Sequence, residues 1–201
     1  MHTPLSSYYK ENTVEAGCDE AGRGCLAGPV VAASVVLPAE FKHPWLNDSK
    51  QLSEKKRTEL VGVIEKEALS SAVSFVYEDE IDTINILNAS FLAMHKAVDQ
   101  LIIKPELLLI DGNRFNKHPE IEHVCIIKGD AKFLSIAAAS ILAKHYRDEF
   151  MRKIDKEFPV YEWKKNKGYP TKTHRKAIEE NGSCKYHRKS FNLLPQPTFN
   201  F

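Results

Sequence analysis

The sequence has few cysteines and no long apolar run. It holds 4 cysteines in 201 residues, and none of them forms a C-x-x-C pair. We therefore expect reduced thiols rather than a disulfide scaffold or a zinc site. No apolar run approaches the ~20 residues that span a bilayer, and residues 1–12 contain no apolar core of a signal peptide. These absences predict a cytoplasmic protein.

A strong excess of charge of one sign is also absent, because the formal net charge is only +1. The sum hides an asymmetry along the chain. Residues 1–143 hold 14 Lys/Arg and 20 Asp/Glu, whereas residues 144–189 hold 14 Lys/Arg and 7 Asp/Glu. A basic segment that follows an acidic one suits a polyanion bound beside cation-binding carboxylates. The alternative is a solvated helical face, which is the commoner origin of charge runs.

The apolar pattern predicts one α/β domain over residues 1–201. Strands come first and then alternate with helices, which favours a mixed β-sheet flanked by helices. A basic helical part is expected at the C-terminal end, from about residue 160 to 201. Strands are predicted at residues 14–18, 29–37, 72–77, 107–110 and 124–127. Helices are predicted at residues 53–69, 85–101, 133–157 and 171–181.

Acidic residues follow three of the predicted strands. They are Asp19 and Glu20, then Asp111, then Asp130. If these strands are neighbours, the four carboxylates converge at one edge of the sheet and raise each other's pKa values. Divalent Mg²⁺ or Mn²⁺ would remove that penalty, since hard ions prefer carboxylate oxygen, and two such ions would form a two-metal nuclease site. The alternative is that Asp111 and Asp130 merely end their strands.

A glycine-rich loop comes directly after the first acidic pair. Adjacent strand residues point to opposite faces of a sheet, so Asp19 and Glu20 serve one site only if the backbone kinks. Gly22 and Gly24 permit such a kink and a close approach of the backbone to a ligand. The alternative is an ordinary surface turn.

The order of these motifs resembles the ribonuclease HII family of the ribonuclease H-like superfamily. The resemblance extends from about residue 15 to 191. The matching motifs are Asp19-Glu20-Ala21-Gly22-Arg23-Gly24, Asn47-Asp48-Ser49-Lys50, Leu109-Ile110-Asp111-Gly112-Asn113-Arg114, Lys128-Gly129-Asp130, Ala138-Ala139-Ser140-Ile141-Leu142-Ala143-Lys144 with Arg147-Asp148, and Gly168-Tyr169-Pro170-Thr171 with His174.

The resemblance implies a ribonuclease H-like sheet with a helical C-terminal extension, and a specific activity. The family hydrolyses the RNA strand of RNA–DNA hybrids and nicks duplex DNA 5′ of an embedded ribonucleotide. It leaves a 3′-hydroxyl and a 5′-phosphate and uses two Mg²⁺ or Mn²⁺ ions. By motif match, the catalytic and metal-binding carboxylates are those of Asp19, Glu20, Asp111 and Asp130. A role in ribonucleotide removal and RNA primer processing follows.

The resemblance also implies substrate contacts. Gly22, Arg23 and Gly24 match the loop that reads the ribonucleotide 2′-hydroxyl, the group that distinguishes RNA from DNA. Tyr169 matches the tyrosine that stacks on the next sugar. The remaining expected contacts with the duplex are those of Asn47, Ser49, Lys50, Ser140 and Lys144.

Some of these residues have a second interpretation. Ser140 and Lys144 lie four apart on one helix face and could both face the duplex, but Lys144 could also be a solvated lysine. Asp148 could simply pair with Lys144. His174 is equally consistent with a structural role and with a phosphate contact. Gln51 stands where the family often has a second lysine, so one phosphate contact could be missing.

Two other functions remain open at this point. One is another nuclease of the same superfamily, of the resolvase or integrase type. The other is a non-catalytic module that binds hybrid duplexes. The apolar tail, with Leu193, Leu194 and Phe201, could fold back or dock a partner such as a sliding clamp. Nothing in the sequence demands more than a monomer.

Overall fold

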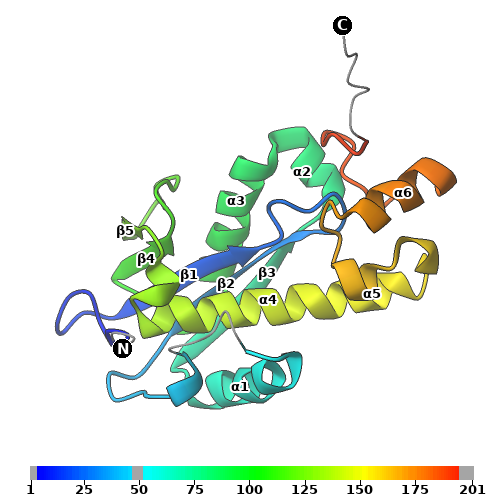
Figure 1. Ribbon diagram of the computed structural model, residues 1–201. Coiled ribbons are helices and arrows are strands. Elements are labelled where there is room, and N and C mark those ends of the chain that lie inside the picture. The colour runs from blue at the N-terminus through cyan, green and yellow to red at the C-terminus, as the bar shows by residue number, and fades with distance from the viewer. Residues whose placement is uncertain (1–3, 47–51, 195–201) are drawn as a thin grey trace, which may run out of the picture.

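The central feature of the fold is one five-stranded sheet (Figure 1). The computed structural model describes residues 4–46 and 52–194. The strands lie in the order β3-β2-β1-β4-β5. Their bounds are β1 Glu15–Ala21, β2 Val30–Val36, β3 Ser70–Val76, β4 Leu107–Asp111 and β5 Glu122–Ile126.

The sheet is mixed, as the sequence predicts. β1 pairs antiparallel with β2, and β2 pairs antiparallel with β3. On its other side β1 pairs parallel with β4, and β4 with β5. Parallel neighbours place their carboxyl ends at the same edge. The fold therefore brings the ends of β1, β4 and β5 together.

Six α-helices accompany the sheet in the described residues. They are α1 Glu54–Glu67, α2 Glu78–Ile84, α3 Ile86–Asp99, α4 Leu134–Asp155, α5 Trp163–Asn166 and α6 Lys172–Asn181. The four helices predicted from the sequence are α1, α3, α4 and α6. Ser53 and Thr171 cap α1 and α6 through their hydroxyl oxygens, as N-cap residues commonly do.

The sequence gives no clear signal for α2 and α5. These helices are only 7 and 4 residues long, too short to show an apolar period. Asn85, with a positive φ of 66°, separates α2 from α3, and its side chain caps α3.

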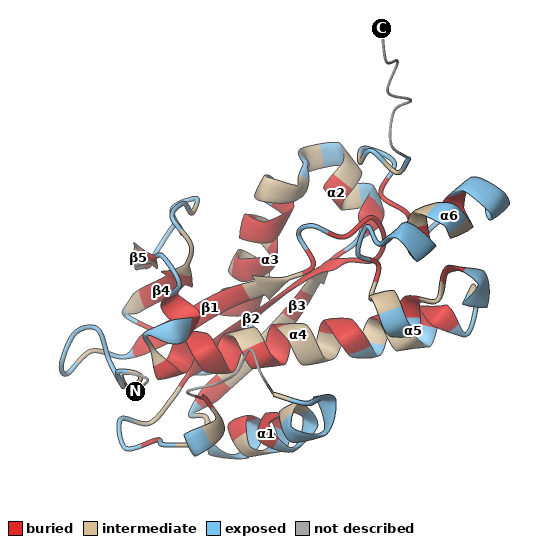
Figure 2. Cartoon of the chain, viewed as in Figure 1, coloured by how far each residue is buried: buried red, intermediate tan, exposed pale blue. Residues whose placement is uncertain are grey.

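Helices cover both faces of the sheet. α3 packs on one face, while α4 and then α1 lie on the other (Figure 1). Side chains of β1 alternate between these layers: Ala16 and Cys18 belong to the core under α3, whereas Gly17 meets the backbone of α4. β1 and β2 are buried along almost their whole length (Figure 2). No described helix has the length and apolar character needed to cross a membrane.

The C-terminal part packs against the far end of α4. Its core includes Trp163 and Ile178 together with Met151 of α4. His174 is fully buried there and accepts a hydrogen bond of 3.0 Å from the Trp163 indole. A phosphate contact by His174 is therefore wrong, because its ring is enclosed by protein and has a structural partner.

The close approach of α4 to β1 at Gly17 predicts the effect of a larger residue there on stability. A Cβ atom on Gly17 would lie 2.2 Å from the Ser135 carbonyl carbon and 2.3 Å from the Ile136 nitrogen. Because these are backbone atoms, they cannot move aside cheaply. We expect Gly17→Ala to lower the free energy of unfolding by about 1–3 kcal/mol, as overpacking does, measured by urea denaturation.

Gly62→Ala is the matched control. Gly62 lies within α1, and a Cβ atom there has no neighbour within 4 Å. This variant should gain up to about 1 kcal/mol, since alanine is the better helix former. A Gly17→Ala protein as stable as the wild type would contradict the close packing of α4 on β1.

Candidate active site

The first acidic pair lies inside β1 rather than after it. β1 continues to Ala21, three residues beyond its predicted end, because the apolar β2 pairs with it as far as Ala21. The strand alternation then separates the two side chains. Asp19 lies on the α4 side, where Ser140 is its neighbour. Glu20 lies on the α3 side and lines a cavity there.

Asp111 stands beside this pair at the end of β4. Cys18 is opposite Ile110 in the parallel register, so the next step along both strands brings Asp19 level with Asp111. The Asp111 carboxylate also accepts a 2.7 Å hydrogen bond from the Gly129 amide. That contact joins the end of β4 to the turn after β5.

Asp130 follows Gly129 in this turn and is buried, with 6% of its surface exposed. The turn is a short 3-10 helix, Gly129–Ala131, packed against α4. The fold thus brings Asp19, Glu20 and Asp111 together at the sheet edge, and Asp130 lies in the turn that bonds to Asp111. Within residues 4–46 and 52–194, no three Asp, Glu, His or Cys side chains already form a ready metal-ligand cluster.

Electrostatic repulsion connects three of these acids. Burial raises the pKa of Asp19 well above its ordinary value, and the neighbouring Glu20 and Asp111 carboxylates raise it further. Burial also raises the pKa of Glu20, although the nearby Arg23 guanidinium opposes this shift. Arg23 forms an ion pair of 3.1 Å with Glu20. The site therefore disfavours its own full negative charge, which a cation would offset.

A cavity of about 270 Å³ opens on the Glu20 side of the strand. Glu20, Arg23 and Asp111 line it together with the side chains at the start of α3. The segment after β4 completes the wall with Gly112, Asn113 and Arg114. The acids thus border a space that is open to a ligand.

The glycine-rich loop has a conformation that needs glycine at one position. Gly22 has φ of 101°, and a Cβ atom there would lie 2.0 Å from the Arg147 side-chain Nε. Gly24 has no atom within 4 Å of its Cβ position. The loop is therefore packed tightly on its inner side at Gly22 and open at Gly24, which differs from an ordinary surface turn.

Tyr169 lies beside this loop and is 41% exposed. The Gly168 carbonyl accepts a 2.8 Å hydrogen bond from the Leu26 amide, and the Tyr169 side chain is a neighbour of the Cys25 thiol. Burial of part of the ring raises the pKa of Tyr169. The Lys144 ammonium lies 5.8 Å from the ring centroid. The predicted loop and tyrosine are thus neighbours in space.

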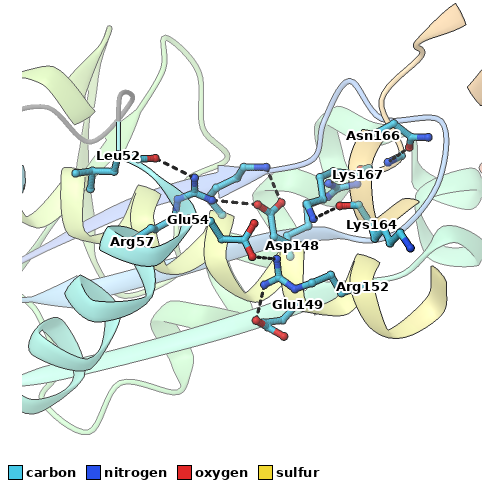
Figure 3. Close-up of polar contacts among 12 residues, drawn as sticks. Leu52, Glu54, Arg57, Asp148, Glu149, Arg152, Lys164, Asn166 and Lys167 are labelled. Carbon is cyan, nitrogen blue, oxygen red and sulfur yellow. Dashed lines mark hydrogen bonds and ion pairs between the residues drawn. The ribbon is translucent and has the colours of Figure 1, made fainter. Parts of the chain in front are cut away.

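Lys144 is also held by Asp148, as the alternative interpretation of the sequence states. Their ion pair measures 2.5 Å, and the Lys144 side chain keeps 34% of its surface exposed. Arg57 of α1 reaches the same carboxylate at 3.1 Å and also contacts the Leu52 carbonyl (Figure 3). Sequence analysis missed Arg57, because no local pattern connects it to α4. Asn47, Ser49, Lys50 and Gln51 lie outside the described residues.

Comparison with known proteins identifies the relatives of this chain. The sequence model of the ribonuclease HII family matches residues 16–194. Ribonuclease HII of Bacteroides thetaiotaomicron is 63% identical over 196 residues, which cover 98% of each chain. Ribonuclease HII of Porphyromonas gingivalis is 58% identical over 187 residues, 93% of each chain.

Similar solved structures come from the same group of nucleases. The ribonuclease H2 of Pyrococcus horikoshii OT3 has a TM-score of 0.73 at 25% identity, covering 89% of this chain and 94% of that one. Ribonuclease HII in the PCNA complex from Archaeoglobus fulgidus has a TM-score of 0.72 at 26% identity, covering 92% and 98%. Bst-RNase HIII in complex with Mn²⁺ shares the fold, with a TM-score of 0.60 at 20% identity over 89% of this chain and 64% of that one.

Fold and site together define a nuclease with the ribonuclease H fold. The chain belongs to the ribonuclease HII family. It is therefore an endoribonuclease that cuts the RNA strand, and the family assignment decides against the resolvase, integrase and non-catalytic alternatives.

Carboxylate repulsion predicts an unusual effect of Asp19→Asn on stability. The folded protein raises the pKa of Asp19, so the ionised carboxylate lowers the free energy of unfolding at high pH. This destabilisation disappears as the pH falls and the carboxylate takes up a proton. At pH 8, with a chelator present to remove metal ions, Asp19→Asn should raise the free energy of unfolding by about 1–3 kcal/mol. The gain should vanish near pH 4, measured by denaturant titration.

Asp82→Asn is a control for which we expect the opposite change in the free energy of unfolding. Hydrogen bonds from Ser190 and the Lys189 amide lower the pKa of Asp82 despite some burial. Its negative charge therefore stabilises the fold at pH 8, and the asparagine should lower stability. Equal losses in both variants would show that Asp19 is not strained by its neighbours.

Proposed function

We propose that this ribonuclease also nicks duplex DNA on the 5′ side of an embedded ribonucleotide, by metal-dependent hydrolysis that leaves a 3′-hydroxyl and a 5′-phosphate. One observation carries the proposal: the acids at the ends of β1 and β4 lie beside a loop and a tyrosine suited to reading a single sugar. Asp19, Glu20 and Asp111 are the proposed catalytic carboxylates, with Asp130 as the fourth.

The donor set fits a hard divalent ion. All four groups offer carboxylate oxygen, which Mg²⁺ and Mn²⁺ prefer, and the raised pKa values of Asp19 and Glu20 report repulsion and burial that a cation would relieve. The Mn²⁺ complex of Bst-RNase HIII supports the same choice. Bound in such a site, two ions supply an activated water and stabilise the charge on the leaving 3′-oxygen.

The chain's own residues recognise the sugar in this proposal. Gly22 and Gly24 carry no side chains of their own, and the space at the Gly24 Cβ position is open, so backbone N–H and C=O groups of this loop can approach a 2′-hydroxyl, which both donates and accepts. The exposed part of Tyr169 can lie against the sugar that follows and disfavour a second 2′-hydroxyl there. Lys144 supplies positive charge beside that ring.

Further contacts with phosphate would position the duplex. We assign these to Asn47, Ser49 and Lys50, on the strength of their motif. Ser140 lies on the same face of α4 as Lys144 and is a neighbour of Asp19, so we assign it the role of orienting that carboxylate as well as lining the path of the duplex.

In the cell we propose that the enzyme removes ribonucleotides from DNA and processes RNA primers in the cytoplasm. An archaeal relative has been solved in complex with PCNA, which supports a sliding-clamp contact through the C-terminal tail. Leu193 packs on the C-terminal core and Leu194 is 41% exposed. The rest of that tail, with Phe201, lies outside the described residues.

The proposal is tested with a DNA duplex that carries one ribonucleotide. We expect a single nick on its 5′ side in Mg²⁺ or Mn²⁺ and none in EDTA. Cleavage in EDTA would refute the metal site. Cleavage of long hybrids without nicking at the single ribonucleotide would refute the proposed specificity while leaving the family activity intact.

Asp111→Asn tests the carboxylate site by activity. The amide keeps an oxygen for the Gly129 N–H but removes the negative charge, so we expect kcat to fall by roughly 10³-fold or more when metal chemistry is lost. Binding of a hybrid duplex should change less than about threefold. Asp99→Asn, at the exposed end of α3, should keep full activity. An active Asp111→Asn enzyme would remove Asp111 from the site.

Tyr169→Ala tests recognition of the following sugar. Loss of the ring should reduce nicking at a single ribonucleotide by about tenfold or more, with a smaller effect on duplex affinity, because the ring positions the sugar rather than attracting phosphate. Steady-state kinetics and a binding titration on the same duplex separate these effects. Equal losses in both would show a general affinity contact instead.

A further inference from the structure

Two buried arginines hold the loop between β1 and β2. Arg147 comes from α4 and Arg188 from the segment after α6, and their exposed fractions are 1% and 0%. Buried arginine is rare and costly when it lacks an acidic partner. Among the described residues, neither guanidinium forms an ion pair with a carboxylate. Their placement therefore needs an explanation beyond packing.

The partners of both guanidinium groups are backbone carbonyls. Arg147 donates to the carbonyls of Pro29 and Ala27, each at 3.0 Å. Arg188 donates twice to the Gly28 carbonyl, at 2.9 and 2.7 Å, and once to the Arg23 carbonyl at 3.0 Å. Among the described residues, the backbone hydrogen bonds outside helices and strands include none to these carbonyls, and buried carbonyls need donors. The two side chains thus fix the backbone of the β1–β2 loop, residues 22–29, which begins with the Gly-Arg-Gly segment.

Arg147 connects this loop to Tyr169. Its third hydrogen bond, of 2.8 Å, goes to the Lys167 carbonyl, two residues before the tyrosine. Its guanidinium carbon lies 5.9 Å from the Tyr169 ring centroid. One rigid planar group therefore contacts both the loop that would read the 2′-hydroxyl and the segment that carries the ring.

The glycines around these contacts leave no room for a shift. The Gly22 Cβ position lies 2.0 Å from Arg147 Nε, and the Gly168 Cβ position lies 2.5 Å from the Ala27 carbonyl oxygen. Burial and the neighbouring Arg147 lower the pKa of Arg188 to about 10, so Arg188 keeps its charge at neutral pH. The two segments are packed as one unit through the arginines.

We propose that Arg147 and Arg188 are positioning residues that set the spacing between the Gly-Arg-Gly loop and Tyr169, and hence the preference for a ribonucleotide followed by deoxyribose. The inference rests on the proposed function of that loop and ring. Lysine cannot replace them, because it has a single nitrogen and lacks the planar fork that reaches several carbonyls at once.

The test is a duplex in which a short run of ribonucleotides is followed by DNA. The ratio of cuts at the junction to cuts inside the run is measured within one substrate, so it does not depend on how much enzyme is folded. We expect Arg147→Lys and Arg188→Lys to lower this ratio about tenfold or more, since small displacements of positioning groups have large effects. The ratio should approach that of Tyr169→Ala.

Arg175→Lys is the matched control. Arg175 also donates to backbone carbonyls, those of Asn192 and Leu193, but it does not contact the loop or Tyr169. Its variant should retain the wild-type ratio. A similar loss in Arg175→Lys would assign the effect to the C-terminal part in general and overturn the proposal.

The outcomes separate this inference from the proposed function. A wild-type enzyme with no junction preference refutes the proposed specificity itself. A wild-type preference that Arg147→Lys and Arg188→Lys both retain overturns the inference alone. If Arg147→Lys does not fold, Arg188→Lys decides the question through its own bonds to the Gly28 and Arg23 carbonyls. Unfolding of both variants overturns the proposal as well, because the arginines would then maintain the fold rather than the site.

Discussion

The close contact between α4 and β1 determines where the functional residues lie. The helix runs alongside the strand in the same direction: Ser135 meets Gly17, Ser140 is a neighbour of Asp19, and Arg147 fills the space at Gly22. The five steps from residue 17 to 22 and the twelve from 135 to 147 each cover about 17–18 Å. Because the two lengths match, α4 stays in contact with β1 along this stretch. One helix therefore positions Asp19, Lys144 and the Gly-Arg-Gly loop relative to one another.

The same contact creates an electrostatic cost at the sheet edge. Asp19 is forced into a buried position beside Glu20 and Asp111, and each charge disfavours the others. Arg23 offsets part of this repulsion through its ion pair with Glu20. Such repulsion between carboxylates is what a bound cation would offset, and it therefore supports the proposed metal site. The fold supplies the packing that tolerates this cost.

Much of this arrangement could be predicted from the sequence, and the rest had no local signal. The acids follow apolar runs, so their positions at strand ends were readable, although the extension of β1 to Ala21 depends on pairing with β2. Arg147 stands next to Asp148 in a charged stretch and looks solvated, yet it is buried against carbonyls more than a hundred residues away. His174 resembles a surface residue of a basic helix for the same reason: its partners come from tertiary packing.

The central claim is that the carboxylates at the ends of β1 and β4 share bound ions beside the Gly-Arg-Gly loop. Anomalous diffraction from crystals soaked in Mn²⁺ tests it most directly. The account predicts Mn²⁺ peaks within bonding distance, about 2.0–2.3 Å, of oxygens of Asp19, Glu20 and Asp111. Peaks confined to other acids, with these three carboxylates unligated at saturating Mn²⁺, would contradict it.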